Sequence, residues 1–171
     1  MPNYAELQVA TNYSFLRGAS HPEELFAEAA RLGIAALGIA DRGTLGGMVR
    51  AHQAAAEMGV RLVVGCRLDL EEEDGLEEED GKKTVLVYPA DRAAYARLCR
   101  LLTLGKSRAG KGGCRLGWKD LVAAGEGLLV VLVPDEADEV LGRALDRLAG
   151  DFPDRAYLAL TLRRRPNDAA R

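Results

Sequence analysis

The chain has 171 residues, of which 48% are hydrophobic and 29% are charged, a composition typical of a globular domain and not of a disordered segment. Its net charge of −3 excludes a polycation, so any contact with nucleic acid or a membrane must come from a local patch. Three cysteines without a Cys-x-x-Cys pair, no export signal and no long apolar run favour a cytoplasmic protein with reduced thiols.

The first 64 residues alternate between predicted strands and predicted helices. Helices are indicated by apolar residues at helical spacing and by a glycine at each C-terminal end, and buried strands by unbroken apolar runs. The predicted elements are a strand over 4–11, a helix over 20–32, a strand over 34–40, a helix over 44–58 and a strand over 60–64. This order is typical of a parallel sheet or barrel in the α/β class.

An acidic loop over 71–81, which contains EEEDGLEEED, interrupts this order. We interpret it as a solvated hairpin tip or mobile loop, because like charges repel and stay hydrated. A metal site or a site for a basic partner is the alternative, but the acids lack the spacing of a calcium loop. Further strands are expected over 84–88, 128–133 and 156–162, and helices over 91–104, from Trp118 and over 135–149; a basic tail follows over 163–171.

A basic, glycine-rich loop over 105–117, GKSRAGKGGCRLG, invites comparison with a phosphate-binding loop. It has Gly-x-x-x-x-Gly-Lys, but Gly112 stands where a Ser or Thr is needed, and the segment follows a helix instead of a strand. A nucleotide site is therefore not favoured. The alternatives are an ordinary solvated loop, or a flexible loop that contacts phosphate or nucleic acid through Lys106, Arg108, Lys111 and Arg115.

Neither histidine belongs to a spaced ligand pair, and we expect His21 and His52 to be ordinary surface or capping residues. No Ser/His/Asp order and no paired carboxylates stand out. The loops that follow the predicted strands thus lack the side chains of an active site.

Three stretches, ELQVATNYSFLRGAS, ADRGT and GCRLDL, resemble the opening of a polymerase and histidinol phosphatase (PHP) domain. DRAAYARLCRLLTLGKSRAGKG and RAYLALTLRRRPNDAAR resemble the error-prone branch of bacterial C-family DNA polymerases, paralogues of the replicative DNA polymerase III alpha subunit. The resemblance spans essentially the whole chain. It implies a distorted (β/α) barrel, here incomplete with its N-terminal five or six βα units, so that residues 1–171 are expected to be a PHP-like domain truncated at its C-terminus.

The resemblance also places six positions where metal-binding members carry ligands. Two histidines, an acid, an Asp-His pair and a glutamate fall, in that order, on Gln8, Ala10, Arg17, Asp41, Arg42 and Arg67. Only Asp41 keeps a donor suited to a metal, since guanidinium groups repel cations. Either the three arginines form ion pairs with Asp41 and fill the space of the metals, or they form an anion pocket.

The resemblance implies a metal-free, non-catalytic PHP module of an error-prone polymerase, with structural and partner-interaction roles in translesion synthesis and DNA repair. We expect no cofactor in this chain, because the magnesium-binding aspartates belong to an absent polymerase core, so the parent would be the nucleotidyltransferase and this chain alone inactive. Expected partners are the rest of the polymerase chain, DNA through the parent protein and damage-response accessory proteins, but no membrane. The alternatives are an active metal-dependent phosphoesterase (a 3′ exonuclease or pyrophosphatase) and a free-standing binding protein.

Overall fold

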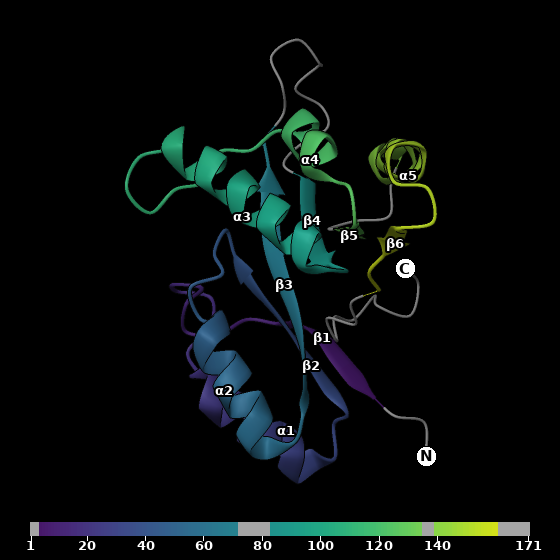
Figure 1. The fold of residues 1–171 in the computed structure, drawn as a ribbon. Coiled ribbons are helices and arrows are strands. Elements are labelled where there is room, and N and C mark those ends of the chain that lie inside the picture. Colours follow the sequence, from purple (N-terminus) through teal and green to yellow (C-terminus); the bar gives the residue numbers. More distant parts are fainter. Residues whose placement is uncertain (1–3, 72–82, 135–138, 161–171) are drawn as a thin grey trace.

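A computed structural model describes residues 4–71, 83–134 and 139–160. Six strands form one curled sheet in the order β1-β2-β3-β4-β5-β6, and five helices lie around it (Figure 1). The elements are β1 (Ala5–Val9), α1 (Pro22–Leu32), β2 (Ala36–Arg42), α2 (Met48–Met58), β3 (Arg61–Leu70), β4 (Lys83–Pro89), α3 (Arg92–Ser107), α4 (Trp118–Ala124), β5 (Leu128–Val133), α5 (Glu139–Asp151) and β6 (Ala156–Leu158). The expected α/β class and incomplete barrel are confirmed.

The long strand β3 joins two halves of the sheet that have different strand directions. Its first part pairs in parallel with β2, which also pairs in parallel with β1. Its end, from Cys66 to Leu70, pairs antiparallel with β4, and β4 pairs antiparallel with β5. The expectation of parallel pairing for the first three strands is therefore confirmed, and β5 also pairs in parallel with β6, whereas β4 runs antiparallel to both of its neighbours.

The acidic loop lies almost entirely outside the described residues. The antiparallel pairing of the strands on either side of it agrees with a hairpin connection. Its first residue, Glu71, is described and accepts a hydrogen bond from Arg115 Nε at 3.0 Å. The expected basic tail over 163–171 also lies outside the described residues.

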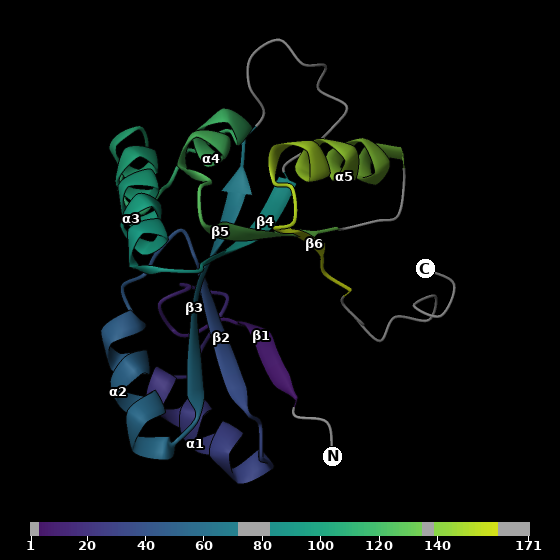
Figure 2. The same cartoon turned by 45° about the vertical axis from the view of Figure 1, so that its right-hand side comes forward.

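Helices cover the outer face of the curled sheet in two groups (Figures 1 and 2). One cluster packs α1 and α2 against β2 through residues such as Phe26 and Ile39. A larger cluster packs α3, α4 and α5 against β3, β4 and β5 through residues such as Leu98, Leu121 and Phe152. None of the described helices is both long enough and apolar enough to cross a membrane.

A third, smaller cluster lies inside the curl and contains Ala40, Leu86, Tyr88 and Val133. The Tyr88 hydroxyl donates a hydrogen bond of 2.5 Å to the carbonyl of Leu7, so β4 contacts β1 although two strands separate them in the sheet order. This contact is direct evidence that the sheet curves back on itself as a partial barrel.

Several predicted boundaries differ from the structure. Helix α3 continues to Ser107 instead of ending at Leu104, because Gly105 does not break it. A Cβ at Gly105 would lie 2.6 Å from Cys114 Sγ and 2.8 Å from Leu116 Cγ, so this glycine allows the following loop to pack closely against the helix. Helix α2 begins at Met48, four residues later than predicted, and β6 ends at Leu158 instead of Leu162.

Candidate functional site: the C-terminal ends of β1 to β3

The six positions that correspond to metal ligands lie at or just after the C-terminal ends of the three parallel strands. Gln8 is a half-buried residue of β1, and Ala10 and Arg17 are exposed in the loop that follows it. Asp41 and Arg42 end β2, and Arg67 lies on β3 beside Arg42 in the register of the two strands. The structure therefore brings these positions into one region, as the resemblance implies.

Asp41 is fully buried and forms the centre of a closed set of hydrogen bonds. Its Oδ1 accepts hydrogen bonds from the Thr11 backbone N–H at 2.8 Å and from Ser14 Oγ at 2.6 Å, and its Oδ2 accepts one from Thr11 Oγ1 at 2.7 Å. Thr11 and Ser14 are themselves buried. Both carboxylate oxygens thus accept hydrogen bonds from the loop after β1. These bonds hold that loop against the end of β2, where Asp41 lies.

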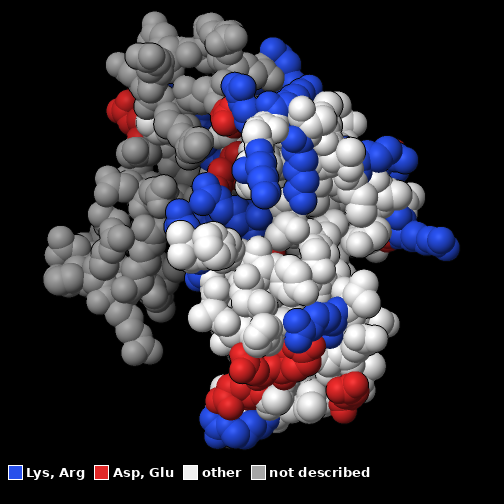
Figure 3. Space-filling view, turned by 90° about the vertical axis from the view of Figure 1, so that its left-hand side faces the viewer, with Lys and Arg blue, Asp and Glu red and all other residues white. Residues whose placement is uncertain are grey.

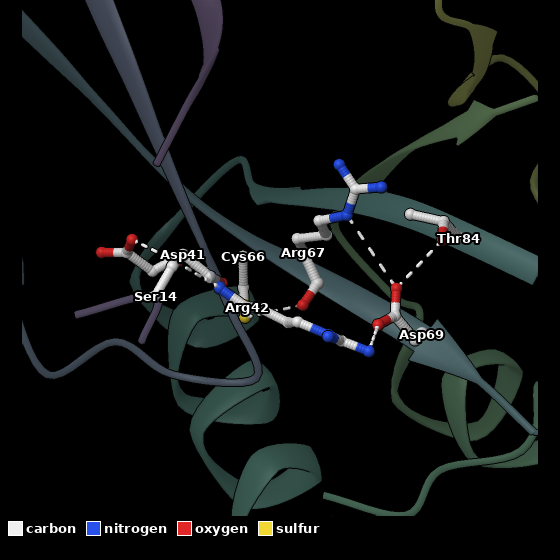
Figure 4. Close-up of polar contacts among 7 residues, drawn as sticks. All are labelled: Ser14, Asp41, Arg42, Cys66, Arg67, Asp69 and Thr84. Atoms are coloured by element: carbon white, nitrogen blue, oxygen red, sulfur yellow. Dashed lines mark hydrogen bonds and ion pairs between the residues drawn. The ribbon is translucent and has the colours of Figure 1, made fainter. Parts of the chain in front are cut away.

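The expected ion pairs between Asp41 and the arginines are wrong. Arg42 forms an ion pair with Asp69 instead, and Arg67 Nε lies 3.9 Å from Asp69 Oδ1 (Figure 4). Thr84 Oγ1 also donates to Asp69 Oδ1 at 2.9 Å. Arginine side chains are long enough to turn away from a buried acid whose oxygens are already engaged, and here they pair with Asp69, whose side chain is 15% exposed.

The residues that complete this region, Thr11, Ser14 and Asp69, were missed by the sequence interpretation. For Asp69 a signal was available, because side chains two residues apart on a strand point to the same face, and Asp69 follows Arg67 by two. For Thr11 and Ser14 the sequence contains no such signal. Hydroxyl side chains are common in loops, where they form local hydrogen bonds, so these two did not stand out.

A pocket of about 940 Å³ opens beside this region. It is lined by the loop after β1, the ends of β2 and β3, and the basic loop between α3 and α4. Five cationic and two anionic side chains belong to the lining: Arg17, Arg42, Lys106, Lys111, Arg115, Asp69 and Glu71. Two groups of residues that are far apart in the sequence, the strand-end arginines and the basic loop, therefore share one cavity.

Arg108 and Arg67 do not belong to this lining. Arg108 Nη1 donates to Asp120 Oδ2 at 2.6 Å, and the Gly117 N–H donates to the same oxygen at 2.9 Å. Burial opposes ionisation of Asp120, but these hydrogen bonds outweigh it and hold the pKa of Asp120 below its usual range. Arg108 thus ties the basic loop to the start of α4.

The described residues include no group of three or more His, Cys, Asp or Glu side chains arranged to hold a metal ion. His21 and His52 are exposed, at the start of α1 and within α2. Where the resemblance places ligands around Asp41, this chain offers an amide, a methyl group and three guanidiniums, which do not fit a divalent cation.

Comparison with known proteins gives matches to error-prone DNA polymerases over nearly the whole of this chain. The chain is 60% identical to error-prone DNA polymerase 1 of Agrobacterium fabrum over 99% of its own length and 15% of that protein. It is 57% identical to error-prone DNA polymerase 2 of Rhizobium meliloti, with 96% of the chain and 14% of that protein covered. The chain thus spans about 15% of the length of these relatives.

Solved structures share the fold at low sequence identity. An amidohydrolase from Chromobacterium violaceum, described with bound sulfate and no metal, superposes with a TM-score of 0.63 at 17% identity over 89% of this chain and 75% of that one. A candidate metal-dependent phosphoesterase from Bifidobacterium adolescentis gives 0.61 at 18% identity over 91% and 77%. The family model of the PHP domain matches residues 6–160. By this match and by the curled sheet that carries it, the chain belongs to the PHP domain family.

Proposed function

We propose that this chain serves as the PHP module of an error-prone DNA polymerase and that the module is structural instead of catalytic. Relatives at 48–60% identity carry the name error-prone DNA polymerase, which supports the parent activity and a role in translesion synthesis and DNA repair. A cytoplasmic location is part of the same proposal. In this proposal the module supports the rest of the polymerase chain and offers surface to damage-response proteins.

One observation carries the non-catalytic part of the proposal. Asp41, the one ligand position that keeps a metal donor, is buried and accepts three hydrogen bonds from Thr11 and Ser14. A metal would have to displace these donors, and it would find no further ligand at the neighbouring positions Arg42 and Arg67, whose guanidinium groups pair with Asp69 instead. A guanidinium group has no lone pair to offer a cation.

The alternative is an active metal-dependent phosphoesterase, such as a 3′ exonuclease or a pyrophosphatase. The fold supports it, since a candidate metal-dependent phosphoesterase has the same fold. The side chains do not, because hydrolysis by a metal site needs ligands that keep an open position for water.

Hydrolysis assays distinguish the two. The chain would be incubated with Mn²⁺, Zn²⁺ or Mg²⁺ and with a 3′-labelled oligonucleotide, pyrophosphate or bis-p-nitrophenyl phosphate. We expect no metal-dependent turnover above buffer. Turnover that co-purifies with the chain and is lost in Asp41→Asn would contradict the proposal.

A further inference from the structure

The pocket beside the strand ends is lined by more cationic side chains than the described acidic side chains pair with. Arg42 and Arg115 have acidic partners in Asp69 and Glu71. Among the described residues, no ion pair engages Arg17, Lys106 or Lys111, all of which are exposed. Three cations from two separate segments therefore face one cavity, in a chain whose net charge is −3. Figure 3 shows most Lys and Arg side chains of one face gathered over the half that carries α3.

Aromatic side chains stand in the same lining. Phe15 and Tyr13 both belong to the pocket, and Phe15 is 84% exposed. Because most of the Phe15 ring stays in contact with water, burial of this ring contributes almost nothing to the stability of the fold. Its apolar surface is therefore available for contact with a ligand.

The loop that presents Phe15 is fixed by hydrogen bonds. Asp41 holds Thr11 and Ser14 before the ring, and the N–H groups of Arg17 and Gly18 donate to the Ser14 carbonyl at 2.8 and 3.0 Å after it. A Cβ at Gly18 would lie 2.2 Å from the Thr11 carbonyl oxygen, so only glycine permits this tight turn. The loop therefore holds Phe15 and Arg17 outward in a fixed arrangement, at low cost in ordering entropy upon binding.

Tyr13 is held in a different way. A Cβ at Gly47 would lie 2.7 Å from Tyr13 Cδ2, which shows that the ring packs directly on the backbone before α2. Tyr13 is thus a wall of the pocket, and Phe15 is the ring with a free face.

We propose that this pocket binds single-stranded nucleic acid, with phosphates at Arg17, Lys106 and Lys111 and an unpaired base stacked on Phe15. A cationic groove beside exposed aromatic rings is the arrangement that binds single strands without sequence preference, since every base has a face for stacking. The 940 Å³ volume is at the upper end of the range for small-molecule sites, about 300–1,000 Å³. A duplex satisfies the cations but leaves Phe15 unused, because its bases are already stacked. An acidic protein segment satisfies the cations but offers no base. The inference goes beyond the proposed function and requires no metal.

Fluorescence anisotropy of a labelled deoxythymidine decamer tests the proposal, with the 171-residue chain in a buffer that contains a chelator. Two double variants are compared: the pocket variant Lys106→Glu/Lys111→Glu and the control variant Arg92→Glu/Arg100→Glu. Both double variants make the same charge change on or just after α3, but Arg92 and Arg100 are exposed residues outside the pocket. Phe15→Ala tests stacking, and unlabelled duplex DNA and polyglutamate serve as competitors. Circular dichroism checks that each variant is folded.

We expect saturable binding that the pocket variant weakens at least tenfold and the control variant less than threefold. The pocket variant should also lower the slope of log K against log salt by about 1.4, for two lost phosphate contacts at about 0.7 each. Phe15→Ala should weaken binding at least about fivefold, the equivalent of roughly 1 kcal/mol for one stacked base. Absence of decamer binding, equal losses in the two double variants, or competition by duplex or polyglutamate as strong as by the single strand would overturn the proposal.

Discussion

Ser14 Oγ lies 2.6 Å from Oδ1 of Asp41, with both side chains buried. This hydrogen bond joins the loop after β1 to the end of β2 at a position where the family resemblance places a metal ligand. The Asp41 carboxylate accepts hydrogen bonds from protein donors through both of its oxygens, and buried bonds of this kind stabilise a fold. Its role in this chain is therefore expected to be stability.

Asp41→Ala should lower the free energy of unfolding by about 3 kcal/mol or more, because it removes a charged acceptor and leaves buried hydroxyl and N–H donors without a partner. Asp41→Asn keeps one acceptor oxygen and should cost less. Urea unfolding measures both, with Asp146→Ala on the exposed side of α5 as the control. An Asp41→Ala chain as stable as the control variant would show that the hydrogen bonds of Asp41 contribute little.

The contact between Tyr88 and Leu7 predicts a second pair of effects. Tyr88→Phe should cost about 1 kcal/mol, since it removes the 2.5 Å hydrogen bond to the Leu7 carbonyl, and should speed hydrogen exchange in β1. Gly65→Ala should cost more, about 1–3 kcal/mol, because its Cβ would lie 2.5 Å from Tyr88 Cε1.

Gly142→Ala is the matched control for Gly65→Ala. A Cβ at Gly142 would meet nothing within 4 Å, and alanine is favoured over glycine inside a helix by up to about 1 kcal/mol. This variant should be as stable as the parent or more so. Equal effects of the two glycine substitutions would argue against the close approach of Tyr88 to β3.

Stability should fall as the pH rises above about 9. Burial raises the pKa of the Cys66 thiol from 9.0 to about 12, so between these values the unfolded chain loses a proton that the folded chain keeps. The unfolded state then binds fewer protons, and the free energy of unfolding decreases by up to about 1.4 kcal/mol per pH unit. Burial, followed by the charge of Glu6, also raises the pKa of Tyr88, which acts in the same direction at higher pH.

Urea unfolding between pH 8.5 and 10.5 measures this slope. Cys66→Ala should make it shallower, whereas Gly142→Ala, which removes no titratable group and meets nothing within 4 Å, should leave it unchanged. Parallel slopes for the parent and Cys66→Ala would contradict the assignment to Cys66.

Asp69→Ala should separate stability from ligand binding. The Asp69 side chain is 15% exposed and also accepts a hydrogen bond from Thr84, so the substitution should cost about 1–3 kcal/mol of stability. Because the substitution releases Arg42 into the pocket, binding of the deoxythymidine decamer should tighten. Weaker binding by a folded Asp69→Ala chain would mean that Asp69 orders the site instead of competing with the phosphates.

The parallel half of the fold could be predicted from the sequence because its signals are local. Apolar runs separated by helices that end at Gly33 and Gly59 predict β2, β3 and the helices between them, and the structure confirms these elements with αL glycines at both helix ends. The direction of β4 remained open in the sequence. The acidic run before it is compatible with a hairpin tip, which implies antiparallel pairing, or with a mobile loop, which fixes no direction.

At the site, residue types could be predicted but not their pairing. From Ala10, Arg17 and Arg67 the sequence predicts a site without metal ligands, since none of these side chains coordinates a cation. The arginines were nevertheless assigned to the wrong acid, because the sequence does not show that the oxygens of Asp41 are already engaged by Thr11 and Ser14. The joint cavity of Arg17 with Lys106 and Lys111 depends on tertiary packing, which brings the loop between α3 and α4 against the strand ends.

Metal stoichiometry tests the central claim most directly. The chain would be stripped with a chelator, dialysed against Mn²⁺ or Zn²⁺, and analysed for bound metal beside Asp41→Asn. The account predicts that neither ion is retained at the strand ends, so that the parent and Asp41→Asn hold the same amount, well under one equivalent. One or more equivalents retained by the parent and lost in a folded Asp41→Asn chain would contradict it.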